Sequence, residues 1–92
     1  MEFEWAPAKA AANLRKHKVS FDEAVTVFAD FFSVTTLDPD HSGEELRYIT
    51  VGRTNRERLI MIAHVERRGT IRIISARMLT RNERSAYEEI SR

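Results

Sequence analysis

The chain has 92 residues, of which 42% are hydrophobic and 32% are charged, so one compact domain over 1–92 is predicted and a disordered chain is excluded. It has no cysteine, which excludes disulfides and thiolate metal sites and favours the cytoplasm. The net charge is only +1 and no apolar run approaches the ~20 residues that span a bilayer, so neither a strongly basic nucleic-acid binder nor a membrane protein is indicated.

The first third of the chain predicts two helices joined by a tight corner. The alternating segment "EFEW" reads as a short strand or an extended lead-in. A helix follows over 7–17, which is rich in strong helix formers and ends in three basic residues. A second helix is expected over 21–29, because Ser20 and Glu23 have the spacing of a capping box.

The remainder of the chain predicts a sheet followed by a third helix. Four strands are indicated by alternation and by β-branched or apolar content, at 31–38, 46–52, 58–65 and 70–78. The connections between them are short, which favours antiparallel pairing in a meander. Thr80 and Glu83 repeat the capping spacing before a helix over 81–90. The expected fold class is therefore α+β: a helical hairpin, a four-stranded antiparallel meander and a C-terminal helix.

Arginines gather on these strands and on the last helix. Arginine is the side chain best shaped for bidentate contacts to phosphate. Those on or at the ends of adjacent strands are Arg47, Arg53, Arg72 and Arg77, and those on the helix are Arg81 and Arg84. Strict alternation puts Arg72 and Arg77 on opposite faces, so both serve one site only if a bulge or the strand's end re-aims Arg77. The alternative is a set of ordinary solvated or salt-bridged side chains.

The three histidines are scattered, and no metal site is expected from their spacing. His17 ends a helix, His41 lies in an acidic turn, and His64 lies on the third meander strand. His64 has the parity of Ile60 and Ile62, which favours a core or sheet-face histidine with a hydrogen-bonded ring. The other interpretation is a proton donor or acceptor that works near neutral pH. No Ser-His-Asp pattern and no Gly-rich phosphate loop are present.

Three separated stretches carry the most specific sequence pattern. They are "NLRKHKVSFDEA", the Glu-x-Arg of Glu45 and Arg47, and "RIISAR" followed by "ERSAY". Together they resemble BrnT-type toxins, the ribonuclease partners in bacterial type II toxin–antitoxin pairs. The resemblance implies a RelE-like fold, RNA cleavage without metal or other cofactor, and a block of translation. It also implies a BrnA-type antitoxin, with a complex that binds its own promoter DNA.

The resemblance also implies which residues matter and where this chain departs from the family. The matching polar residues are Lys16, His17, Glu45, Arg47, Arg72, Ser75, Arg77, Glu83, Arg84 and Tyr87. Ala6 stands where the family usually has aspartate, and if that aspartate caps the first helix its loss costs roughly 0.5–2 kcal/mol. Lys18 replaces a common glycine at a position that would favour a left-handed backbone. Leu79 replaces a usual alanine.

Metal-free cleavage of RNA requires a base for the 2′-hydroxyl, cations for the phosphoryl oxygens and an acid for the leaving oxygen. We expect Arg72 and Arg77 to hold the scissile phosphate, assisted by Arg53 or Arg47. The proton-transfer candidates are His64 and Glu66. The residues expected to bind RNA beyond this centre are Arg47, Arg81, Arg84, Lys16 and Tyr87, with Tyr87 also a reserve donor. The alternative function is a non-catalytic module that binds RNA, DNA or a partner, or a degenerate toxin.

Overall fold

The computed structural model describes residues 1–41, 43 and 45–90. Its elements in chain order are β1 (Glu2–Glu4), α1 (Pro7–His17), α2 (Phe21–Ala24), the 3-10 helix η1 (Val25–Ala29), β2 (Val34–Leu37), β3 (Arg47–Arg53), β4 (Leu59–Arg67), β5 (Thr70–Met78) and α3 (Arg81–Ile90). The predicted bounds of the first helix, the last strand and the last helix are confirmed. The second helix is wrong as a single α-helix, because it tightens to 3-10 geometry after four residues. No helix in the described part of the chain is long and apolar enough to cross a membrane.

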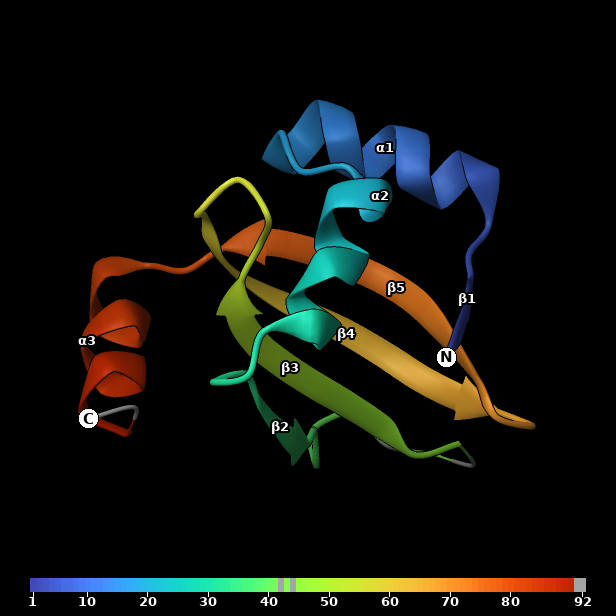
Figure 1. Cartoon of the computed structure of the whole chain (residues 1–92). Coiled ribbons are helices and arrows are strands. Elements are labelled where there is room, and N and C mark those ends of the chain that lie inside the picture. Colours follow the sequence, from blue (N-terminus) through green and yellow to red (C-terminus); the bar gives the residue numbers. More distant parts are fainter. Residues whose placement is uncertain (42, 44, 91–92) are drawn as a thin grey trace.

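The sheet has five strands in the order β1-β5-β4-β3-β2 (Figure 1). β2, β3, β4 and β5 pair antiparallel in succession, whereas β1 pairs parallel with β5, with Glu2 opposite Thr70. The predicted four-stranded antiparallel meander is therefore wrong as a complete sheet. The N-terminal segment forms the fifth strand, β1, and pairs with β5 near the other end of the sequence. No local sequence pattern indicates a pairing over this distance.

The helical layer α1, α2 and η1 covers one face of the sheet, and α3 lies at the end of the sheet away from the N-terminus (Figure 1). Phe21, Ile62 and Ile73 are almost fully buried between this layer and the sheet. β1 contributes Phe3, whose ring centroid is 5.2 Å from that of Phe28. Burying each such side chain stabilises the fold by about 1.5–3 kcal/mol. The main core thus uses one sheet face, while a smaller cluster packs α3 against part of the other face.

A buried asparagine joins α1 to the sheet. Asn13 is only 7% exposed, and its amide donates to the carbonyl oxygens of Val19 at 2.9 Å and Ala76 at 2.8 Å. The amide oxygen accepts from the Ala76 N–H at 3.1 Å. One side chain therefore satisfies three buried backbone groups from two parts of the chain. This gives a physical reason for an asparagine at the start of "NLRKHKVSF".

The ends of α1 show the consequences of two sequence departures. Ala6 is the N-cap and supplies no side-chain hydrogen bond to the helix. Lys18 ends the helix with φ 60° and ψ 29°, the left-handed conformation expected at a position that favours glycine. Both positions therefore lower the stability of α1 relative to a chain with aspartate and glycine there.

β5 contains one residue more than the facing part of β4. Ala63 pairs with Ser75, but the next residue, His64, pairs with Ile73, so Ile74 has no opposite residue. Such a β-bulge shifts the alternation of side chains by one position. The residues of β5 that face the helical layer are therefore odd-numbered before the bulge and even-numbered after it.

Candidate functional site

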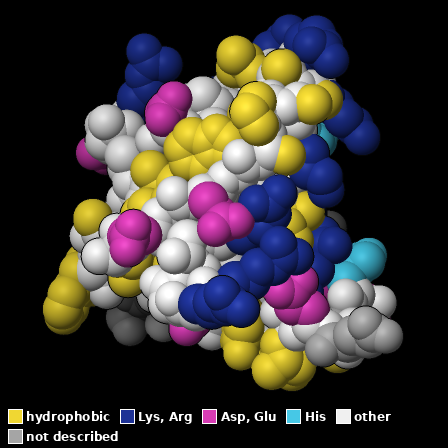
Figure 2. Space-filling model, turned by 90° about the vertical axis from the view of Figure 1, so that its right-hand side faces the viewer, with side chains coloured by type: hydrophobic (Ala, Val, Ile, Leu, Met, Phe, Trp, Pro, Cys, Tyr) yellow, Lys and Arg dark blue, Asp and Glu magenta, His cyan; other side chains and the backbone are white. Residues whose placement is uncertain are grey.

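Three arginines lie on the sheet face opposite α1 and α2. The bulge puts Arg72 and Arg77 on this same face, which strict alternation would have prevented. Arg47 of β3 joins them: it pairs with Val65, and Val65 pairs with Arg72 on its other side. Two strand spacings put the Cα atoms of Arg47 and Arg72 roughly 10 Å apart. Figure 2 views the β1 side of the molecule and shows a band of Lys and Arg side chains with Asp and Glu side chains set into it.

A hollow of about 310 Å³ opens on this face between β3 and β5. Arg47 and Arg77 both line it, from strands on either side of β4. Its remaining lining residues are Asp38, His41, Ile49, Met61, Ala63 and Ser75. The hollow thus has two guanidinium groups, one carboxylate, one imidazole and one hydroxyl over an apolar floor. Guanidinium groups beside apolar surface suit a group that is anionic at one end and less polar at the other, as a sugar phosphate is.

Each of the three arginines also has a carboxylate partner. Arg77 forms a two-point pair with Glu83 of α3, at 2.8 and 2.9 Å. Arg72 donates to Glu4 of β1 at 2.5 Å, and the Nε of Arg47 is 3.8 Å from Asp38. The hydrogen bond from Arg77 lowers the pKa of Glu83 to about 2. Each of these arginines is therefore salt-bridged, as the alternative interpretation of the sequence expected. Arg47 and Arg77 nevertheless line one hollow.

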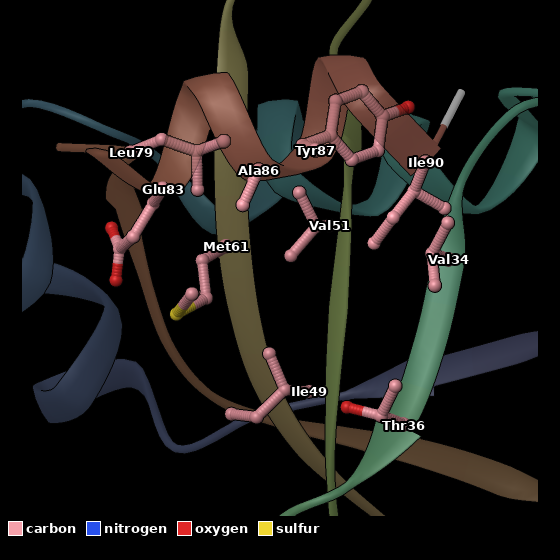
Figure 3. A pocket seen from close by; sticks show the side chains of 10 residues that line it. All are labelled: Val34, Thr36, Ile49, Val51, Met61, Leu79, Glu83, Ala86, Tyr87 and Ile90. Atoms are coloured by element: carbon pink, nitrogen blue, oxygen red, sulfur yellow. The ribbon is translucent and has the colours of Figure 1, made fainter. Parts of the chain in front are cut away.

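A second hollow of about 230 Å³ lies beside the first, beneath α3 (Figure 3). Its walls are almost entirely apolar, and it shares Ile49 and Met61 with the arginine-lined hollow. Tyr87 packs here, and its hydroxyl donates to the Phe32 carbonyl oxygen at 2.9 Å. Tyr87 therefore anchors α3 to the segment before β2, and it does not line the arginine hollow.

Four of the basic residues expected to contact RNA lie elsewhere. Arg53 and Arg84 line a different hollow, together with Glu57, Arg58 and Glu88. Arg81 is exposed on α3, and Lys16 is exposed on α1, which belongs to the helical layer on the other face. The predicted arginine set thus divides between two hollows: Arg47 and Arg77 line the one on the open sheet face, and Arg72, expected to act with Arg77, does not line it.

His64 faces the helical core and not the arginines. It is 5% exposed, and its ring packs edge-on against Phe28 at 5.1 Å. Its Nε2 lies 2.7 Å from the Thr50 hydroxyl, while its Nδ1 has no hydrogen-bond partner among the described residues. Burial lowers the pKa of His64 to about 4, so the ring is neutral at physiological pH. Glu66 has the same parity on β4 and also lies away from the hollow.

The sequence interpretation passed over the histidine that does line the hollow. His41 follows β2, and its Nδ1 is 3.0 Å from Asp38. In the sequence this pair is marked only by Asp-x-x-His in the turn before β3, and such a spacing is not typical of a metal site. No group of three His, Cys, Asp or Glu side chains in the described ranges converges as metal ligands would.

The burial of His64 predicts an acid-sensitive stability. In the unfolded chain His64 takes a proton as the pH falls below 6.5, whereas in the folded chain it does so only near 4. The stability contributed by the neutral ring is therefore lost as the pH falls through this window, by on the order of 2 kcal/mol between pH 7 and 5. Urea unfolding at both pH values should show this loss, and His64→Gln should reduce the difference. Identical pH dependence in the two proteins would contradict a buried neutral ring.

The comparisons with known proteins identify the family of the chain. Residues 5–83 match a family model described as ribonuclease toxin, BrnT, of type II toxin-antitoxin system. This match puts the chain in the class of ribonuclease toxins from type II systems, on an α+β fold with a mixed five-stranded sheet. The chain belongs to the BrnT family, as the sequence resemblance indicated.

A solved structure supports the fold independently. The crystal structure of the Brucella abortus ribonuclease toxin, BrnT, is similar with a TM-score of 0.67. The alignment covers 88% of this chain and 99% of that chain at 21% identity, so it supports the fold and not the roles of single residues. A comparison with characterised proteins gives no match.

Proposed function

We propose that this chain is an endoribonuclease that cleaves RNA without a metal ion. The observation that carries the proposal is the hollow on the open sheet face, where Arg47 and Arg77 converge from two strands. Two fixed guanidinium groups can neutralise the charge that develops on the phosphoryl oxygens during attack by the 2′-hydroxyl. Family membership supplies the reaction class.

The positions of the other basic residues refine their proposed roles. Arg72 lies on the same face, two strands from Arg47, and is proposed to hold the RNA backbone next to the cleaved phosphate. Arg53 and Arg84 line another hollow and are not assigned to the cleaved phosphate. His64 and Glu66 are not assigned to proton transfer, because they lie on the helical side of the sheet.

The biological setting follows from the family and is proposed for this chain. Cleavage of RNA would block translation in the cytoplasm, and a BrnA-type antitoxin would neutralise the toxin. The toxin–antitoxin complex would bind its own promoter DNA through the antitoxin. We also propose that residues 1–92 act as one RelE-like toxin domain, since one continuous sheet joins the first strand to the last.

Expression of the chain provides the test. Induction should arrest growth, and a co-expressed antitoxin from the neighbouring gene should relieve the arrest. The purified chain should cut single-stranded RNA in the presence of EDTA, leaving 2′,3′-cyclic phosphate ends. A folded chain that neither arrests growth nor cuts RNA would refute the proposal.

One observation favours a second candidate, a binding module without catalysis. Arg47, Arg72 and Arg77 each have a carboxylate partner, and such pairing reduces the positive charge available to RNA. Under this alternative, the chain would bind RNA or its antitoxin with no cleavage and no growth arrest. Binding without cleavage by the same purified protein would favour this candidate over the ribonuclease.

A further inference from the structure

The turn after β2 holds an Asp–His pair at the mouth of the arginine hollow. Asp38 continues the pairing of β2 with β3, because its N–H donates to the Arg47 carbonyl oxygen at 2.8 Å. Its carboxylate is 3.0 Å from His41 Nδ1 and 3.8 Å from Arg47 Nε. The side chain of Asp38 is 13% exposed, whereas that of His41 is 61% exposed. A largely buried carboxylate thus holds an accessible imidazole next to a guanidinium group.

This arrangement prepares one ring nitrogen for proton transfer. A carboxylate beside Nδ1 favours the tautomer that carries its proton there, which leaves the lone pair on Nε2. Nε2 of His41 has no hydrogen bond to any part of the chain that the structure describes. His64 differs on each count, since its Nε2 is bonded to Thr50 and its ring is buried.

We propose that His41, positioned by Asp38, is the general base for RNA cleavage in this hollow. The inference rests on the ribonuclease function proposed above and identifies the proton acceptor, which that proposal does not assign. Nε2 takes the proton of the 2′-hydroxyl while the 2′-oxygen bonds to phosphorus and the bond from phosphorus to the 5′-oxygen breaks. Water protonates the departing 5′-oxygen, and the imidazolium returns its proton to the hydroxide so formed. The products are a 2′,3′-cyclic phosphate and a 5′-hydroxyl.

The charged groups around the ring fit these steps. Asp38 faces it from the end of β2, Arg47 from β3 and Arg77 from across β4. Asp38 stabilises the imidazolium once the proton has transferred, and the two arginines stabilise the phosphoryl oxygens. Ser75 adds a neutral hydroxyl at the β5 side. Base, orienting carboxylate and cations therefore surround one hollow.

The test compares His41→Ala and Asp38→Asn with the parent chain, using a single-stranded RNA oligonucleotide. His41→Ala should lower the single-turnover cleavage rate roughly 10²–10⁴-fold with RNA affinity little changed. The parent rate should fall on the acid side of its pH profile, and this acid limb should disappear in His41→Ala. Added imidazole should restore part of the rate to His41→Ala but none to Arg77→Ala. Asp38→Asn should keep the acid limb and lose less rate, as expected of a positioning residue.

The outcomes separate this inference from the proposed function. If the parent cuts RNA, and a folded His41→Ala protein cuts at the parent rate with its acid limb intact, the general-base role is wrong and the ribonuclease function stands. If the parent binds RNA but never cuts it, both are wrong. Loss of RNA affinity in His41→Ala at an unchanged maximal rate would make His41 a binding residue and would also overturn its role as base.

Discussion

Arg77→Ala should lower the rate of RNA cleavage about 10²–10³-fold, the size of effect seen when one fixed donor to a developing oxyanion is removed. Arg77 lines the hollow and is held by Glu83 in a two-point pair, so its guanidinium is already oriented before RNA arrives. Arg47→Ala should give a loss of similar size, because it faces the same space from β3. Single-turnover cleavage of an RNA oligonucleotide provides the measurement.

Two controls make this result specific. Arg15→Ala removes an exposed arginine from α1, on the helical side of the sheet, and should cut like the parent. Arg77→Ala also leaves Glu83 without its partner, so the double variant Arg77→Ala with Glu83→Gln removes the unpaired carboxylate. The double variant should be folded and still defective. Parent-like cleavage by folded Arg47→Ala and Arg77→Ala proteins would remove the basis for the phosphate site.

Asn13→Ala should lower the free energy of unfolding by about 2–4 kcal/mol. The change deletes three hydrogen bonds and leaves the N–H and carbonyl groups of Ala76 and the carbonyl of Val19 without them in the interior. Asn13→Asp should cost more, because it places one carboxylate oxygen against two carbonyl oxygens. Urea unfolding of the purified variants measures both effects.

Asn82→Ala is the matched control for this change. Asn82 is exposed on α3, so its replacement should alter stability by no more than about 0.5 kcal/mol. An Asn13→Ala protein as stable as Asn82→Ala would mean that Asn13 does not join α1 to β5 in solution.

Local sequence pattern predicted the elements better than it predicted their partners. The capping spacing of Thr80 and Glu83 appears as two reciprocal hydrogen bonds, at 2.9 and 3.2 Å. At Ser20 only half of the predicted box forms, because the Glu23 carboxylate bonds to Arg58 and Thr54 instead. Those partners lie more than 30 residues away in sequence, as does the partner of β1. Residue propensities and spacings contain no information about contacts at this range.

The candidate site was predictable in residue type and less so in geometry. Arginine enrichment on adjacent strands predicted Arg72 and Arg77 as the principal pair with Arg53 or Arg47 assisting, whereas Arg47 and Arg77 line one hollow in the structure. The prediction also included Arg53, which lines a different hollow. Spacing along one strand does not show which residues of the neighbouring strands lie beside it. His64 had the parity of a core residue and is one. His41 was not selected, because no spacing in the sequence indicates that it lines the same hollow as Arg47 and Arg77.

The additional residue in β5 lets Arg72 and Arg77 share a face although five positions separate them. Deleting Ile74 would make Ile73 and Ser75 neighbours in a regular strand, with Ala76 still on the hydrophobic layer and Arg77 still on the open face. A strand that kept Ile74 but lost the bulge would instead turn Arg77 toward the hydrophobic layer. The strand can therefore lose one residue at this position and keep both faces. Genetic variation in this family should accordingly place one-residue gaps of this strand at the bulge.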